Sequence, residues 1–394
     1  MDDTKLRAWW WHRQGLDGSM EGRSPSEVLE RAGWSRSVGG VGPYLALFAR
    51  AGTSREEADQ AVATLQIHEL PTARGCTYVV PASDFALGLK VGQRFEDNEM
   101  KTAVKLGVTE KEVDKLCDAV LAALGREPLD PDAIRQATGT ASRSLGEAGK
   151  KKGLTTTLPL ALGRLQGRGE IRRVPVNGRL DQQRYRYAVW KPSPLARYKA
   201  TLSESYTELA RRFFRWNGPT TLGEFAWFSA LGVKASKEAV EPLTLVPAEE
   251  NSNRLLLPED VDAFRRFKAP NKPQYALVSG LDPLALGREL QSLLDPRDYS
   301  RKFVAAKGTA PGSALKYLET HAIFDRGRLV GAWEYDPEAQ AIVWASFGIE
   351  DKALDAAVKK TETYVREQLG DARSFSLDSP KSRKPRIDAL RKMK

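Results

Sequence analysis

Three neighbouring residues carry side chains that could orient or deprotonate a water molecule. Gln66, His68 and Glu69 lie at the end of a helix that the capping pattern predicts over residues 53–67. A carboxylate or an imidazole in such a group can take a proton from a water molecule. A structural interpretation is also open, in which Glu69 caps the helix or pairs with Arg74. We therefore name Gln66, His68 and Glu69 as candidate catalytic residues and assign no others.

The remaining residues of the metal-binding types are too scattered to form a recognisable site. His12, His68 and His321 share no helical spacing, and Cys76 and Cys117 are far apart in the chain. Zinc sites need several such ligands at short, regular spacing. Two cysteines also exclude a disulfide framework and suit a reducing compartment. We expect neither a metal nor a cofactor.

The positive charge of the chain is concentrated in two segments. The 394 residues carry a formal net charge of +10. Residues 143–186 alone carry +8 and residues 381–394 carry +6, which leaves the rest of the chain mildly acidic. A basic segment on an acidic body indicates a polyanionic partner, although a solvated Lys/Arg face is an alternative. The tail 381–394 is interrupted by proline, and we expect it to be a disordered basic arm.

Residues of the basic segment are the types that contact DNA phosphates. Lysines release counterions from the duplex, and hydroxyl and backbone amide groups at a helix N-terminus donate hydrogen bonds to a phosphate. Because nearly all of these residues suit phosphates, base-specific reading is not implied. The candidate DNA-binding residues are Lys150, Lys151, Lys152, Thr155, Thr156, Thr157, Arg164, Arg168, Arg172, Arg173, Arg179 and Arg184.

The elements that position these residues follow the order of a winged helix-turn-helix. Residues 109–125 and 130–139 predict helices, residues 153–171 predict a helix that runs into a strand, and residues 179–190 alternate as a second strand. The Asn-Gly turn at 177–178 joins the two strands. Similar orders precede and follow this segment, so we expect winged helices over residues 1–98, 99–192 and 193–262.

The C-terminal part of the chain changes to short strands with tight turns. We expect residues 263–394 to form a β-barrel-like domain or an open sheet, covered by a helix over 349–370 and followed by the basic tail. The predicted fold class is therefore α+β: tandem winged helix-turn-helix domains followed by a C-terminal β-barrel-like domain. No stretch approaches the eighteen apolar residues that a transmembrane helix needs.

Five segments, taken in order, resemble the AlkZ/YcaQ-like winged-helix DNA glycosylase family. The first segment, residues 74–84, resembles that family's Arg-Gly-Thr-x-His-x-Val-Pro-x-x-Asp hairpin. The resemblance implies three tandem winged helices and a C-terminal barrel around duplex DNA. It also implies excision of alkylated or crosslinked purines by hydrolysis of the N-glycosidic bond, without metal or cofactor. The segments are RGCTYVVPASD (74–84), GLTTTLPLALGRLQGRGEI (153–171), WNGPTTLGEFAWFSAL (216–231), LDPLALGRE (281–289) and DRGRLVGAWEYD (325–336).

This sequence departs from the family pattern at two places. The family's catalytic Gln-x-Gln or Gln-x-Asp motif corresponds to Gly39-Gly40-Val41 here, and the hairpin histidine corresponds to Tyr78. Glycine and valine side chains cannot position or deprotonate a water molecule.

The sequence therefore predicts a DNA-binding protein of this glycosylase type that excises damaged bases in DNA repair. Two alternatives stay open: a DNA-binding damage sensor or transcriptional regulator without catalysis, and a winged-helix scaffold that binds proteins. The expected partner is double-stranded DNA, with no membrane. We expect a cytoplasmic monomer, associated with the nucleoid when bound to DNA.

Overall fold

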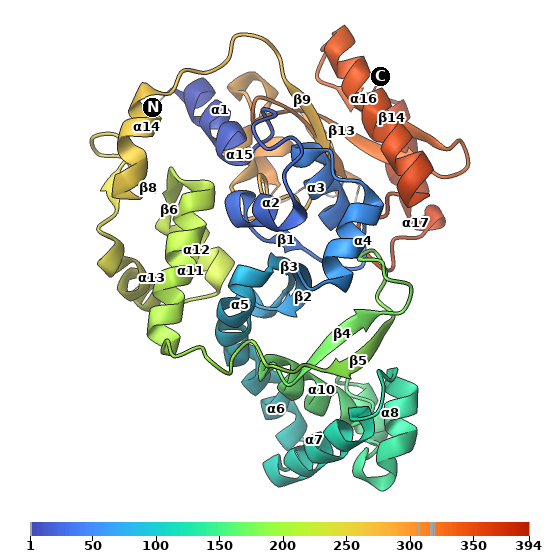
Figure 1. Ribbon diagram of the computed structural model, residues 1–394. Coiled ribbons are helices and arrows are strands. Elements are labelled where there is room, and N and C mark those ends of the chain that lie inside the picture. The colour runs from blue at the N-terminus through green and yellow to red at the C-terminus, as the bar shows by residue number, and fades with distance from the viewer. Residues whose placement is uncertain (1, 306–307, 316–317, 319, 394) are drawn as a thin grey trace.

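The computed structural model describes residues 2–305, 308–315, 318 and 320–393 and shows a mixed α and β chain, as predicted. A larger body contains both ends of the chain, and a smaller, mostly helical lobe extends below it (Figure 1). No helix of the described residues is long and apolar enough to cross a membrane.

The first unit combines three helices with a three-stranded antiparallel sheet of order β1-β3-β2. Ser24 with Glu27 and Ser54 with Glu57 form capping boxes, which fix where α2 and α4 begin. Helix α4 ends earlier than predicted because Leu65 adopts a left-handed conformation and turns the chain into β2. The elements are α2 (Pro25–Ala32), β1 (Ser35–Arg36), α3 (Gly42–Ala51), α4 (Arg55–Ala63), β2 (Ile67–Pro71) and β3 (Thr77–Pro81).

The second unit forms the lower lobe and ends in a two-stranded hairpin. Two helices, α5 (Phe85–Gly92) and α6 (Glu96–Val104), lead into it from the first unit. A bridge between Leu129 and Tyr187 adds a third antiparallel contact beside the hairpin. The elements are α7 (Glu110–Leu124), α8 (Pro131–Thr138), α9 (Gly146–Lys150), α10 (Leu158–Gly167), β4 (Ile171–Pro175) and β5 (Tyr185–Val189).

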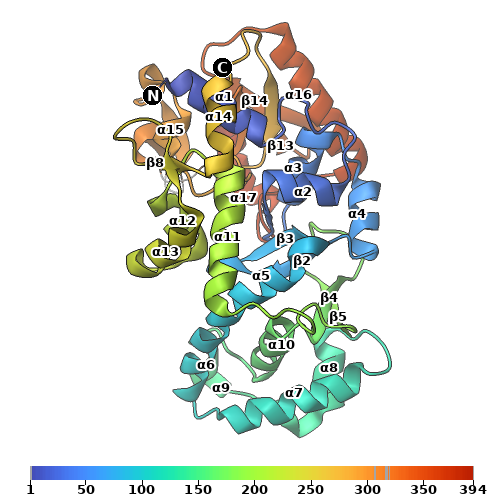
Figure 2. The ribbon, with the colours of Figure 1, turned by 60° about the vertical axis from the view of Figure 1, so that its left-hand side comes forward.

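The third unit repeats the order of elements seen in the first. Its short strands pair as β6-β8-β7, and Thr201 with Glu204 forms a capping box at the start of α11. Figure 2 shows α11 standing upright beside α5, with α14 above its upper end. The elements are α11 (Leu202–Asn217), β6 (Thr220–Thr221), α12 (Leu222–Ser229), α13 (Val233–Val240), β7 (Val246–Pro247), β8 (Arg254–Leu256) and α14 (Val261–Arg266).

The N-terminal helix α1 (Asp3–Arg13) holds distant parts of the chain together through three consecutive tryptophans. All three indoles are buried and donate hydrogen bonds. Trp9 and Trp10 donate to the backbone carbonyls of Gly218 and Pro219, and Trp11 donates to Gln274 Oε1. The helix therefore connects the third unit to the C-terminal part.

The C-terminal part is built on an open antiparallel sheet of order β14-β13-β12-β9, so the barrel-like closure that we expected is not present in the described residues. Helices or loops cover both faces of this sheet, which leaves no need for it to close on itself. Leu277 and Ile323 pack into one core with α3 and α16, whereas Val278 and Phe324 pack into another with α1. The elements are β9 (Tyr275–Val278), α15 (Leu290–Leu293), β10 (Lys302–Ala305), β11 (Gly308–Pro311), β12 (His321–Asp325), β13 (Arg328–Asp336), β14 (Ala341–Ser346) and α16 (Lys352–Tyr364).

The basic tail is a docked helix, so the prediction of a disordered arm was wrong. Helix α17 (Pro380–Arg391) begins with Ser379 as its N-cap and Pro380 in its first turn. Its Ile387 and Leu390 are buried. Arg383 forms hydrogen-bonded ion pairs with Asp371 at 2.7 and 2.9 Å. The arginines of the tail therefore pair with carboxylates of the sheet and of the segment before it.

Candidate functional site

His68 and Glu69 lie in the middle of strand β2, not at a helix end as predicted. The His68 ring is fully buried beside Phe85 and Trp190. Burial, and then the charges of Arg172 and Arg173, lower the pKa of His68 to about 3. His68 is therefore a neutral packing residue at physiological pH and does not meet a substrate.

Glu69 is buried at the contact between the first and second units. Its Oε1 accepts a hydrogen bond from the hydroxyl of Ser37, at the end of β1. Burial raises the pKa of Glu69, while Ser37, the charge of Arg173 and the Tyr185 hydroxyl oppose that rise. The expected pairing with Arg74 was wrong, because the Arg74 guanidinium stacks on the ring of Trp227 instead. Gln66 is exposed in the turn between α4 and β2, just before the strand that carries Glu69 and outside this buried cluster.

The turn that precedes α3 lies directly beside this cluster. Val41 N–H donates to the Arg373 carbonyl and Ser376 N–H donates to the Val38 carbonyl, both at 3.0 Å. Gly39 has φ +74°, and a Cβ placed on Gly40 would lie 2.3 Å from the Ser374 carbonyl oxygen. Glycine is needed at both positions, because the C-terminal segment packs against the backbone of this turn.

A cavity of about 450 Å³, which we call the junction pocket, opens beside the same turn. It lies between the connection of β4 to β5 and the segment that precedes α17, which Figure 1 shows close together on the right of the molecule. A Cβ on Gly39 would approach both the Gln183 side chain and Ser376. The pocket is lined by Val176, Asn177, Gln182, Gln183, Arg184, Arg373 and Ser376.

Several of the predicted DNA-binding residues are exposed and available for a ligand. Lys151 and Lys152 lie in the turn after α9, and Arg184 lies at the edge of the hairpin. Lys150 is also exposed but lies 3.7 Å from a carboxylate oxygen of Glu147. Among the residues that the structure describes, no carboxylate forms an ion pair with Lys151, Lys152 or Arg184. These cations remain free to meet phosphates.

Other predicted DNA-binding residues are engaged within the protein. Arg164 pairs with Glu110 and Asp114 at 2.5 and 2.8 Å, and exposed Arg168 lies 3.8 Å from Asp114. Arg179 forms two hydrogen bonds with Asp181. Nearby carboxylates therefore already neutralise part of the charge of these arginines.

The remaining candidates lie at the interface or beneath the surface. Arg172 is half-buried, and burial lowers its pKa. Arg173 lies over the Tyr185 ring near Glu69. Thr157 is fully buried and accepts a hydrogen bond from the Arg143 backbone, so its predicted phosphate contact was wrong.

Thr155 and Thr156 keep an accessible position. Both line a cavity of about 380 Å³ at the start of α10, together with Arg135 and Arg173. Their hydroxyls therefore lie next to the helix N-terminus, as the sequence predicted, in a place that an anion can reach.

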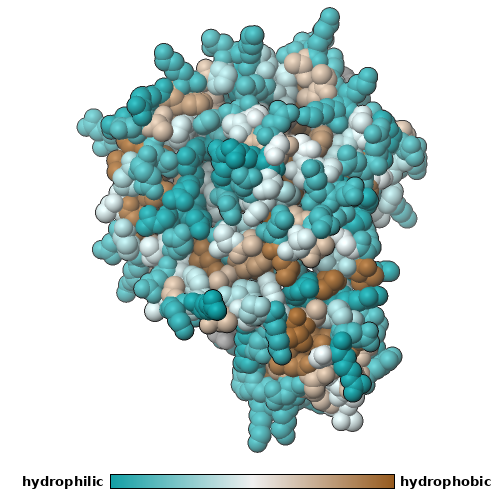
Figure 3. All heavy atoms as spheres, viewed as in Figure 1, coloured by the Kyte–Doolittle hydropathy of each residue, from teal (hydrophilic) through white to brown (hydrophobic). Residues whose placement is uncertain are grey.

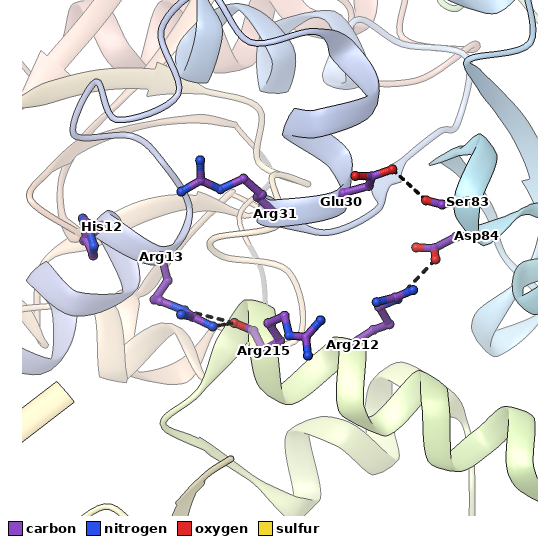
Figure 4. Close-up of a pocket in the computed structure, with 8 residues that line it drawn as sticks. All are labelled: His12, Arg13, Glu30, Arg31, Ser83, Asp84, Arg212 and Arg215. Carbon is purple, nitrogen blue, oxygen red and sulfur yellow. Dashed lines mark hydrogen bonds and ion pairs between the residues drawn. The ribbon is translucent and has the colours of Figure 1, made fainter. Parts of the chain in front are cut away.

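A second pocket, which sequence reasoning missed, is rich in arginine. This arginine pocket has a volume of about 410 Å³ and lies between α1, α2 and α11 (Figure 4). Three of its arginines lie in the last turn of separate helices, where they complement the helix dipole. The positions of these arginines in the sequence do not indicate that the ends of the three helices lie close together. The lining residues are His12, Arg13, Glu30, Arg31, Ser83, Asp84, Arg212 and Arg215.

Most polar groups of the arginine pocket are bound to one another. Figure 4 shows Arg212 directed at Asp84 and Arg13 directed at the backbone of Arg215. Asp84 also accepts a hydrogen bond from Trp34 at 2.8 Å, and burial raises its pKa. Arg13 forms two further hydrogen bonds with Asp260. We interpret this pocket as a polar seam that joins α1 to the first and third units.

In the described part of the chain, no three His, Cys, Asp or Glu side chains are grouped so that they could hold a metal ion.

Comparison with known proteins identifies similar chains. The model of a protein family described as "DNA glycosylase AlkZ-like" matches residues 41–375. No curated protein matches. Among solved structures, the chain is similar to the Streptomyces sahachiroi DNA glycosylase AlkZ with a TM-score of 0.69 and 19% sequence identity. That match covers 94% of this chain and 98% of the Streptomyces chain, so the two share a fold over nearly their whole length.

Proposed function

The chain belongs to the AlkZ-like DNA glycosylase family, and we propose that it binds double-stranded DNA and excises alkylated or crosslinked purine bases. The reaction is hydrolysis: water attacks C1′ of the deoxyribose, the bond from C1′ to the purine nitrogen breaks, and the base leaves. An N7-alkylated purine already carries a positive charge, so it leaves as a neutral base without a proton from the enzyme. The proposed reaction therefore needs an acceptor for the proton of water and no metal or cofactor.

We further propose that the three units are winged helices and that the second one dominates DNA affinity. In each unit helices precede a β-hairpin, and in the first and third units the first strand pairs with the last. The unpaired cations Lys151, Lys152 and Arg184 all belong to the second unit. This set of unpaired cations on one unit is the observation that carries the proposal, since DNA affinity depends largely on phosphate neutralisation.

We place the catalytic centre at the junction pocket, with Glu69 as the proton acceptor. Glu69 is bound to Ser37, two residues before the Gly39 turn, and burial raises its pKa. Glu69 and Ser37 are both buried and neither lines the pocket, so we propose that a water molecule enters beside the Gly39 turn and passes its proton through the Ser37 hydroxyl. That hydroxyl donates its own proton to Glu69 and receives one from the water.

A second candidate function is DNA binding without excision. It is favoured by Gly39, Gly40 and Val41, which supply no polar side chain to the pocket, and by the burial of Glu69. In this case the protein recognises damaged DNA and leaves the glycosidic bond intact.

A base-release assay on N7-methylated duplex DNA separates the two functions. We expect the wild-type protein to release free base and Glu69→Gln to lose release while keeping its affinity for DNA. Asp84→Asn is the matched control, because Asp84 is also buried and also has a raised pKa but lies in the arginine pocket.

Three other results would redirect the proposal. Equal release by Glu69→Gln excludes Glu69 from the reaction. Loss of release only in Asp84→Asn moves the catalytic centre to the arginine pocket. No release by the wild-type protein, with DNA binding intact, supports the non-catalytic function.

A further inference from the structure

The rim of the junction pocket carries apolar side chains that the described residues leave exposed. Leu377 is 81% exposed, Val176 is 50% exposed and Phe375 is 42% exposed. Val176 and Ser376 line the pocket from opposite elements, and Ser376 stands between Phe375 and Leu377. Figure 3 shows apolar surface at this junction, beside the connection of β4 to β5. Soluble proteins seldom gather large apolar residues at one place on their surface unless a partner covers them.

The segment that carries Phe375 and Leu377 is held firmly on both sides. Its backbone is bonded to the turn before α3 through Val41 with Arg373 and through Val38 with Ser376. Asp378 accepts a hydrogen bond from the Ser374 amide and pairs with Arg386 of α17 at 2.8 Å. The two apolar side chains are therefore displayed from a fixed backbone. They do not project from a loose loop that could fold them inward.

The charge around this apolar rim complements DNA. Arg184 lines the same pocket, and exposed Arg186 follows it on β5. Within the described residues neither guanidinium forms an ion pair with a carboxylate. DNA-binding proteins that deform the duplex combine such cations with apolar side chains that insert between base steps. A protein partner that matched this surface would instead need carboxylates facing both arginines.

We propose that Phe375 and Leu377 form a wedge that enters duplex DNA and unstacks the base pair next to the junction pocket. Arg184 and Arg186 hold the phosphates on either side of the wedge, and Val176 supports the displaced base. This proposal rests on the proposed function, because it requires that the protein bind DNA. It adds a distortion of the duplex that neither phosphate binding nor bond cleavage alone requires.

The test follows unstacking directly with 2-aminopurine, whose fluorescence rises when it leaves the base stack. A short duplex carries 2-aminopurine beside one N7-methylguanine. We expect the wild-type protein to raise the fluorescence and the double variant Phe375→Ser/Leu377→Ser to abolish the rise. The double variant should also bind roughly tenfold more weakly. Its salt dependence should stay unchanged, because no charge is altered.

Three single variants complete the experiment, one as a further test and two as controls. Leu377→Ser alone tests the most exposed wedge residue, at a position where a polar side chain costs little stability. Leu377→Met keeps the apolar side chain and should keep the signal. Val233→Ser removes a 70% exposed apolar residue from α13, and it should leave both fluorescence and affinity unchanged.

The possible failures can be told apart. Fluorescence that rises equally with the double variant overturns the wedge and leaves the proposed function standing. A wild-type protein that does not bind the duplex overturns both. A change of oligomeric state in the double variant, measured by sedimentation, shows that the apolar rim joins two copies of the chain, and it also overturns the wedge.

Discussion

Replacing Lys150, Lys151 and Lys152 together with alanine should flatten the salt dependence of DNA binding. Each phosphate neutralised by a cation adds about 0.9 to the slope of log K against log salt. Lys151 and Lys152 are unpaired, whereas Lys150 is partly neutralised by Glu147 at 3.7 Å. The slope should therefore fall by roughly 1.8 to 2.7. Between 50 and 200 mM salt, the affinity deficit of the variant should shrink by roughly 12- to 40-fold.

The assay is fluorescence anisotropy with an unmodified duplex at four or more salt concentrations. The matched control replaces Lys272, Lys352 and Lys359 with alanine. These are exposed residues of the body, and their replacement removes the same net charge as the test variant. The control should lower the slope by much less than the test variant. An unchanged slope in the test variant, with its melting temperature intact, refutes the assignment of this turn to the DNA interface. Equal effects in the two variants would mean that only net charge matters.

Two further predictions concern the docked tail. Deleting residues 380–394 should lower the free energy of unfolding by about 3–6 kcal/mol, because Ile387 and Leu390 lose their burial; an unchanged melting temperature would show that α17 is not docked in solution. Arg386→Met should cost about 3–5 kcal/mol at pH 8 and clearly less at pH 5.5 in urea denaturation. The reason is that burial raises the pKa of Glu334, which Arg386 contacts at 2.7 Å, to about 7.

The direction of this pH effect follows from the protonation of Glu334. A carboxyl whose pKa is raised on folding favours the native state below its unfolded pKa, near 4.5, and this contribution is lost as the pH rises through 7. Removing Arg386 raises the pKa of Glu334 further, so the variant suffers most where the carboxyl must be ionised. Equal losses at the two pH values would contradict this account. Arg366→Met, which breaks a half-exposed pair with Glu362, serves as the control and should cost under about 1 kcal/mol.

Local signals in the sequence predicted the elements well, because capping and turn chemistry act over a few residues. Ser24 with Glu27 and the Asn177-Gly178 turn lie where the sequence placed a helix start and a hairpin. The pattern around His68 misled us because the reversal at Leu65 depends on a backbone conformation that a leucine seldom adopts. The charge count led to the wrong prediction for the tail, because it does not show that Glu334 and Asp371 form ion pairs with arginines of the tail.

The site was harder to predict than the elements, because it is assembled from distant segments. Ser37 follows β1, Glu69 and Tyr185 lie on strands of two units, and Arg373 lies in the segment that precedes α17. The arginine pocket is a similar case, with Arg13 and Arg215 brought together only by the packing of two helix ends. The spacing of residues in a sequence does not show which distant segments come into contact.

The close packing of the C-terminal segment on Gly39 and Gly40 limits which side chains the turn can accept. A glutamine at position 39 would collide with Gln183 and Ser376 and would require a strained backbone at φ +74°. A single substitution of Gly39 by a polar residue should therefore destabilise the protein unless Gln183 and Ser376 move away. Because the turn and residues 373–376 are in direct contact, substitutions in the two segments should have non-additive effects on stability. Placing a polar side chain in this turn would have to begin with changes in the connection of β4 to β5 or in residues 373–376, and not with the turn itself.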